Sequence, residues 1–168
     1  MQEYLLLLPI IFIIHDMEEI IGFGWFFEKN PDLFERFPKV MNTYRGFTYM
    51  GFAAAVYEEF IPFFGVSLLA YYFPGKVLYG LWYGIFLALV GHFFIHIGHT
   101  IHIRKYIPCF ITSVISLPVS TVILFNCAKQ MTFDITTVVC IVIGIIGMIV
   151  NFPIAHGVMH FVNKRAKA

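Results

Sequence analysis

Charged residues are scarce in this sequence, and its long apolar stretches contain no lysine or arginine at all. Of the 168 residues, 60% are hydrophobic and only 12% are charged, a balance that a soluble domain of this size could not bury. The net charge is +1, and no basic run is longer than the terminal NKRAKA. The composition therefore predicts an integral membrane protein and gives no sign of a nucleic-acid-binding surface.

Cysteine is also scarce, and the sequence has no feature of a cleaved leader. Cys109, Cys127 and Cys140 stand singly in apolar surroundings, without C-x-x-C spacing, so we interpret them as core residues. The first residues, MQEYLLLLPIIF, lack the basic region and the small-residue cleavage site of a signal peptide. We expect this segment to be retained as a helix.

Five apolar stretches are each long enough to cross a bilayer, which takes about 20 residues in a helix. We therefore expect an all-α fold, a bundle of five transmembrane helices forming a single domain over residues 1–168. The predicted spans are 4–27, 47–73, 77–103, 107–126 and 135–162. Between the first two, Asn30 can cap a helix and Pro31 suits its first turn, which predicts a short amphipathic surface helix over 31–41.

The distribution of basic residues predicts the orientation, because Lys and Arg are retained on the cytoplasmic side. With the N-terminus outside, the outer side holds only Lys76 and Lys129. The inner side holds Lys29, Arg36, Lys39, Arg45, Arg104, Lys105, Lys164, Arg165 and Lys167. We therefore place the N-terminus outside and the C-terminus in the cytoplasm.

Ionisable side chains nevertheless occur inside four of the five predicted spans, and all seven histidines are among them. The four groups are His15, Asp16, Glu18 and Glu19; Glu58 and Glu59; His92, His96, His99 and His102; and His156 and His160. Residues three, four or seven apart share one face of a helix. Within each span the histidines therefore point in one direction, and in the first span Glu18 and Glu19 point in the same direction as His15. Asp16 and Asn151 point elsewhere, and we interpret His102 and His160, near the interface, as structural.

An isolated charge at this depth costs several kcal/mol, and no basic side chain lies nearby to neutralise the carboxylates. Imidazole and carboxylate are the usual ligands of transition metals, and their number here exceeds the needs of one tetrahedral zinc. We therefore predict a site for two metal ions. The candidate ligands are His15, Glu18, Glu19, Glu58, His92, His96, His99 and His156. Glu19 and Glu59 are the candidate catalytic bases.

The segment HDMEE, residues 15–19, resembles the H-x-x-E-E motif that defines a largely bacterial family of small membrane proteins. His15, Glu18 and Glu19 match the motif, and chain length and hydrophobicity agree with the family. The resemblance implies that these three residues are important and that the bacterial inner membrane is the location, but it implies no reaction. More distantly, HFFIHIGH is similar to the histidine boxes of membrane di-iron desaturases and hydroxylases.

The favoured function is a metalloenzyme that acts on a membrane lipid or another lipophilic small molecule. Two iron ions would support oxidation or hydroxylation, whereas zinc would support hydrolysis. The alternatives are a proton or metal-ion transporter, a haem protein and a buried His–Glu network that only specifies packing. The oligomeric state does not follow from the sequence.

Overall fold

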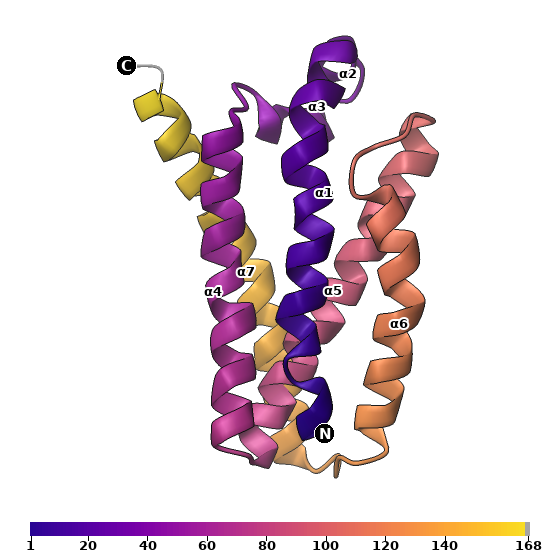
Figure 1. The fold of residues 1–168 in the computed structure, drawn as a ribbon, viewed down its shortest axis with the longest axis vertical. Helices are drawn as coiled ribbons and strands as arrows, with labels where there is room; N and C mark the ends of the chain where they lie inside the picture. The colour runs from indigo at the N-terminus through magenta and orange to yellow at the C-terminus, as the bar shows by residue number, and fades with distance from the viewer. Residues whose placement is uncertain (167–168) are drawn as a thin grey trace.

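The computed structural model describes residues 1–166, and every regular element in that range is helical. The long helices run side by side along one axis (Figure 1), and they are α1 (Leu7–Lys29), α4 (Tyr49–Tyr72), α5 (Lys76–Ile103), α6 (Phe110–Ala128) and α7 (Ile135–Ala166). The short ones are η1 (Gln2–Tyr4), α2 (Leu33–Arg36), α3 (Pro38–Met41) and η2 (Asn42–Tyr44). The prediction of an all-α fold is confirmed.

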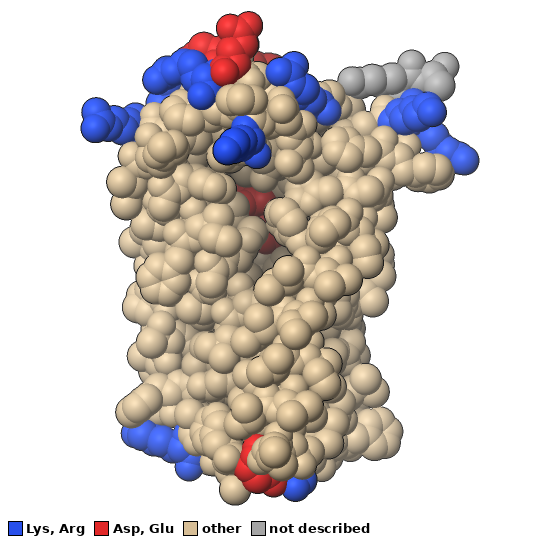
Figure 2. Space-filling model, turned by 180° about the vertical axis from the view of Figure 1, so that it is seen from behind, with Lys and Arg blue, Asp and Glu red and all other residues tan. Residues whose placement is uncertain are grey.

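Four of the long helices in residues 1–166, α4 to α7, are long and apolar enough to cross a membrane. The helix α1 has 23 residues but carries Asp16, Glu18 and Glu19 at its centre. With these three charged residues, its composition is not apolar enough to identify it as a membrane-spanning helix. Figure 2 shows Lys and Arg at the two ends of the molecule and a surface almost free of charge between them. These features indicate an integral membrane protein, whereas the predicted count of five spans exceeds the four helices that composition supports.

Helices α5 and α7 pack most closely where both carry glycine. A Cβ atom at Gly84 would overlap the carbonyl group of Ile141, and one at Gly144 would lie 3.0 Å from the amide nitrogen of Ile85. Such close backbone approach is typical of small residues at helix contacts in membranes. No atom lies within 4 Å of a Cβ built at Gly91 or Gly147, so the close contact does not extend along the whole pair.

Helix α1 turns its polar side chains into the bundle and an apolar stripe outward. The exposed side chains Ile10, Ile14, Met17 and Ile21 recur at helical spacing, while His15, Asp16 and Glu19 are buried. The carbonyl of Leu5, near the start of the chain, accepts a hydrogen bond at 3.0 Å from Nε1 of Trp82, a buried residue of α5. Because α1 turns its apolar stripe outward, its ionisable side chains lie inside the bundle.

Polar contacts fix the two ends of α7. At its start, the Asp134 carboxylate accepts hydrogen bonds from the Thr137 amide at 2.9 Å and from Lys76 Nζ at 2.7 Å. The hydrogen bond from Lys76 lowers the pKa of Asp134 to about 2. Near its end, Asn163 accepts a hydrogen bond from Thr48, which also caps α4 by accepting from the Gly51 amide.

The segment predicted to form one surface helix over 31–41 instead forms two single turns, α2 and α3, joined at Phe37. Proline disfavours helical geometry in the preceding residue, and Phe37, which precedes Pro38, has φ −129° and ψ 56°. The helix also starts at Leu33 rather than at Pro31. The segment still lies at one end of the bundle, above α1 in Figure 1.

We expect Gly84→Leu to destabilise the protein strongly, because the new side chain has no space between the backbones of α5 and α7. Overpacking typically costs about 1–3 kcal/mol, and a clash with backbone lies at the upper end. The measurement is the thermal unfolding midpoint of the purified protein in detergent. Gly98→Leu is the matched control on the same helix, since a Cβ at Gly98 has no atom within 4 Å. Equal midpoints for the two variants would show that this contact does not hold α5 to α7.

Candidate metal centre

Four side chains from α1 and α5 converge inside the bundle. His15, Glu19, His92 and His96, called the quartet below, each direct one nitrogen or carboxylate oxygen to a common point, and these atoms all lie within 4.8 Å of one another. Glu19 Oε1 is 3.0 Å from His96 Nε2 and 3.9 Å from His15 Nε2. His15, Glu19 and His96 are buried, and His92 is half-buried.

A hydrogen-bond chain fixes the orientation of His15. The Thr112 hydroxyl lies 2.6 Å from Glu18 Oε2 and 2.9 Å from His15 Nδ1. The hydroxyl has one proton, which it donates to the ionised carboxylate, so it accepts a hydrogen bond from His15 Nδ1–H. The other ring nitrogen, Nε2, then carries a lone pair, is buried without a hydrogen-bond partner and faces the quartet. This is the arrangement in which a histidine binds a metal, with its second nitrogen held by an outer hydrogen bond.

Glu18 has a different environment from Glu19, although the two are neighbours in the chain. Besides the Thr112 hydroxyl, its carboxylate accepts hydrogen bonds from the Thr112 amide at 2.8 Å and from the Tyr106 hydroxyl. Thr112 lies in the first turn of α6, whose N-cap residue, Cys109, supplies no capping side chain. Glu18 therefore satisfies the start of α6 from a neighbouring helix, where a negative charge is favoured.

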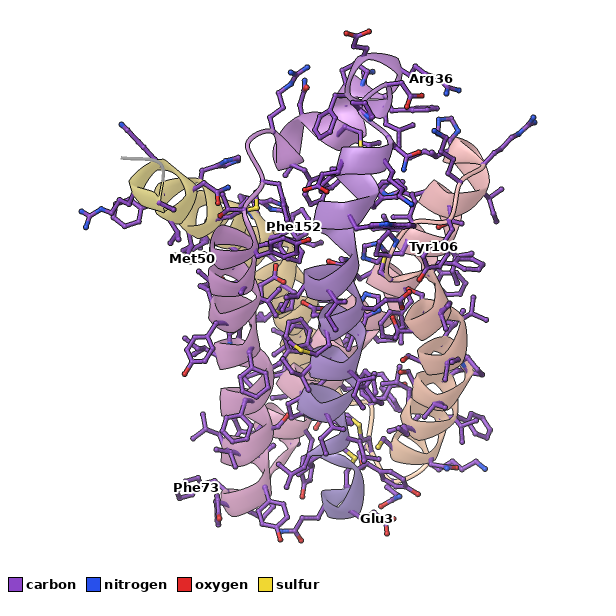
Figure 3. The ribbon with its side chains drawn as sticks, turned by 45° about the horizontal axis from the view of Figure 1, so that its top comes forward. Glu3, Arg36, Met50, Phe73, Tyr106 and Phe152 are labelled. Atoms are coloured by element: carbon purple, nitrogen blue, oxygen red, sulfur yellow. The ribbon has the colours of Figure 1, made fainter. Side chains whose placement is uncertain are left out.

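Tyr106 lies in the connection between α5 and α6 and acts as a donor to Glu18. Partial burial and the hydrogen bond to the carboxylate raise the pKa of its hydroxyl. The phenol therefore stays protonated at neutral pH. In Figure 3, Tyr106 and Phe152 lie on opposite sides of α1.

The two histidines from α5 meet nitrogen to nitrogen. His92 Nε2 and His96 Nε2 are 2.6 Å apart, a separation at which at most one of the two nitrogens can carry a proton. On the far side of its ring, His96 Nδ1 lies 2.9 Å from the buried thiol of Cys109. The two Nε2 atoms must therefore share one proton or a cation.

The quartet fits one transition-metal ion by donor type and by spacing. With metal–nitrogen and metal–oxygen distances of about 2.0–2.1 Å, the ligand atoms of a tetrahedral ion lie about 3.3 Å apart. The contacts of 2.6, 3.0 and 3.9 Å lie on either side of that value, and all pairs are within 4.8 Å, so the side chains would shift slightly to bind one ion. In addition, His15 Nε2 is buried without a hydrogen-bond partner, and Glu19 Oε1 contacts the imidazoles of His96 and His15, so a cation at this point would pair with both atoms.

The structure brings four of the eight predicted ligands together and places the other four around them. Glu18 holds Thr112, and Glu58 Oε2 accepts a hydrogen bond from Asn151 Nδ2 at 3.1 Å. His156 lies near the Phe152 carbonyl, with Nδ1 at 2.9 Å. His99 lies one turn beyond His96 on α5. Of the two residues interpreted as structural, His102 packs edge-on against Phe37, and both His102 and His160 are exposed.

A small cavity of about 30 Å³ adjoins the quartet on the side of α4 and α7. Its polar lining includes Asp16, Glu19, Glu59, His92 and His156. Asp16 was expected to point elsewhere, yet it is only 3% exposed and its Oδ1 has no hydrogen-bond partner. Three carboxylates thus surround a space large enough for a water molecule or an ion.

A second, larger cavity of about 570 Å³ borders the same residues. Glu59, His92, His96 and His99 line it, and most of the remaining wall is apolar, with Phe12 and Phe63 among its residues. Its size lies within the range of small-molecule sites, about 300–1,000 Å³. The quartet is therefore placed between a small polar cavity and a large apolar one.

Sequence reasoning missed Thr112, Cys109 and Tyr106, which contact the quartet or Glu18. These residues precede or begin α6, a helix without ionisable groups, and their role depends on how that helix lies against α1 and α5. The sequence held only a weak signal, the serine and threonine residues along the span that contains Thr112. No spacing rule connects them with His15 or His96.

The fold and site define a helical protein of membrane type with a buried His/Glu group that could hold a metal ion. The chain belongs to the family described as "Protein of unknown function with HXXEE motif", which matches residues 6–123. The resemblance noted at residues 15–19 is thereby confirmed, and the matched stretch contains the whole quartet and Thr112. No curated protein and no solved structure matches the chain significantly.

We expect Thr112→Val to weaken metal binding by about 10–100-fold, the usual loss when the outer hydrogen bond of a metal-binding histidine is removed. The variant keeps the side-chain shape but frees His15 Nδ1. The measurement is a chelator competition on the purified protein. Thr121→Val is the matched control, because its hydroxyl donates only to the Leu117 carbonyl of its own helix. An unchanged affinity in Thr112→Val would rule out this role for the hydroxyl.

Proposed function

We propose that the protein is an integral membrane metalloenzyme that binds a transition metal at the quartet and acts on a lipophilic molecule in the large cavity. The observation that carries this proposal is the convergence of three imidazole nitrogens and one carboxylate oxygen on a point beside an apolar cavity. The buried His15 Nε2, which faces the quartet, has no hydrogen-bond partner and so is free to bind an ion there. Buried hydroxyls of Ser113, Ser120 and Thr137 are likewise without partners, so the convergence of donors, and not a missing partner alone, supports the proposal.

In this proposal α1 is the fifth span. Its 23 residues suffice to cross a bilayer, and its outer face presents Ile10, Ile14, Met17 and Ile21. The carboxylates that set its composition apart are not on that face. The excess of Lys and Arg at the end near α2 and α3 supports a cytoplasmic position for that end and for the C-terminus. Family membership supports the bacterial inner membrane.

The proposed centre holds two ions, of which the quartet takes the first. Glu19, Glu59 and Asp16 line the small cavity, and their carboxylates would hold a second ion there. Carboxylate-rich mixed sites suit iron, which we favour over zinc. Iron would supply the activation of dioxygen: one oxygen atom would enter a C–H bond to give C–OH, while two electrons from a separate electron-transfer protein and two protons would convert the other oxygen atom to water.

The chain itself supplies positioning, exclusion of water and proton transfer. The apolar wall of the large cavity keeps bulk water from the quartet, which strengthens the electrostatic interactions inside. Glu59 lines both cavities, so in a chain with only the quartet occupied its carboxylate would be free to take a proton from a molecule in either one. The same base would serve hydrolysis if the metal were zinc.

Transport of protons or metal ions is the alternative that the same ligands would serve. A conducting path needs ionisable or hydrated groups across the full bilayer. Between the quartet and the end that holds Lys76, the buried side chains of residues 1–166 include no Asp, Glu, His, Lys or Arg. Most are apolar, such as Phe86 and Trp82, and the polar ones are hydroxyls such as Ser67. This apolar half of the bundle favours an enzyme over a transporter.

The test is elemental analysis of the untagged protein, purified in detergent from iron- and zinc-supplemented medium. We expect about two ions per chain, loss of the quartet ion in His96→Ala, and loss of the second ion in Glu59→Gln, since these residues belong to different positions. His102→Ala is the control and should retain the full content. One ion per chain would restrict the proposal to the quartet, and a metal-free wild-type protein would overturn it.

A further inference from the structure

The large cavity opens through the side of the molecule. Figure 2 shows a hollow in the apolar face, below the basic residues at one end, through which acidic side chains are visible. Helices α5 and α7 form this side, behind α1 and α4 in Figure 1. Both contribute to the cavity lining, α5 with Gly91 and Ile95 and α7 with Ile145 and Ile149. The opening therefore faces the lipid and not the water.

Two features of the sequence create this opening. Gly84 and Gly144 bring the helices together at one level, and the helices separate beyond it. Gly91, two turns further along α5, has no side chain, and no atom lies within 4 Å of the position that its Cβ would take. A side chain at Gly91 would therefore project into the gap.

We propose that the gap between α5 and α7 is an entrance through which a single-chain lipid, such as a fatty acid or another long hydrocarbon, passes from the bilayer into the large cavity. This inference rests on the proposed function and specifies its substrate class. It depends on the lining, the position and the size of the cavity.

The lining favours a hydrocarbon chain. Phe12, Phe63 and Leu89 lie on the wall of the large cavity, and each is at most 3% exposed in the structure as a whole. Of the ionisable wall residues, His92 and His96 belong to the quartet, Glu59 also lines the small cavity beside it, and His99 lies one turn beyond His96. A molecule in the cavity thus meets apolar contacts along most of its length and the quartet at one place.

The volume favours one chain over larger occupants. At about 30 Å³ for a group the size of water, 570 Å³ holds on the order of twenty methylene-sized groups. That is one long chain and not the two chains of a diacyl lipid. A ten-residue helix segment, about 15 Å long and 10 Å wide, already fills on the order of 1,000 Å³. A transmembrane helix of a second copy therefore does not fit.

The experiment uses the full chain in phosphatidylcholine vesicles that contain a photoactivatable diazirine derivative of stearic acid. After irradiation, mass spectrometry locates the labelled residues. Phe63 and Leu89 report on the cavity, because the bulk lipid does not reach them, while the exposed Ile143 reports on the outer surface. We expect labelling of all three in the wild-type protein.

Gly91→Phe fills the entrance, and Gly147→Phe is its matched control, an exposed glycine of α7 that also has no atom near its Cβ and does not line the cavity. We expect Gly91→Phe to lose labelling of Phe63 and Leu89 to background while Ile143 stays labelled. Gly147→Phe should keep all three. Metal content, measured on the same samples, should be unchanged in both variants.

Two results would overturn the inference. One is a wild-type protein labelled only on its outer surface, and the other is Gly91→Phe with cavity labelling equal to that of the wild type. A protein that binds metal but gives either result retains the proposed function and loses this entrance. Labelling of Phe63 and Leu89 in a protein that binds no metal would support the lipid site and overturn the proposal of a metalloenzyme.

Discussion

The constraint on which this structure depends is that ionisable groups in an apolar belt must face inward and find partners there. Helix α1 meets it by separating its two faces, with isoleucine outside and the H-x-x-E-E motif inside. The other helices complete the environment of that inner face. Helix α5 brings histidines, α6 brings the amide and hydroxyl of Thr112, and α4 brings Glu59 to the adjoining cavities.

The two glutamates of the motif illustrate how neighbouring residues acquire different tasks. They lie about 100° apart on the helix, so they cannot address the same point. Glu19 faces α5 and the quartet, whereas Glu18 faces α6 and holds the start of that helix. His15 connects the two environments, because one of its ring nitrogens contacts Thr112 and the other faces the quartet. The motif therefore joins a candidate metal site to the architecture that positions it.

Much of this arrangement could be predicted from the sequence, because local physical rules govern it. Apolar length gives the long helices, and spacing of three and four residues gives His15 with Glu19 and His92 with His96. The rise per residue of a helix predicts that these pairs lie at a similar depth in the membrane. What could not be predicted depends on rotation and tilt between helices. Asp16 is on a face that turns out to be interior, Glu58 finds Asn151, and Thr112 and Cys109 approach from a helix that carries no ionisable residue. The break in the helix at Phe37 could have been predicted, because Pro38 follows it, but the amphipathic pattern suggested one continuous helix.

The close contact at Gly84, in the first third of α5, is a point about which that helix would tilt. From Gly84 to His92 the helix rises about 12 Å, so a change of about 10° in the crossing angle moves His92 by about 2 Å. At Gly91 the displacement is nearly the same. The width of the gap between α5 and α7 and the separation of His92 from Glu19, which lies on α1, are thus mechanically linked. A tilt of α5 about Gly84 would change both together.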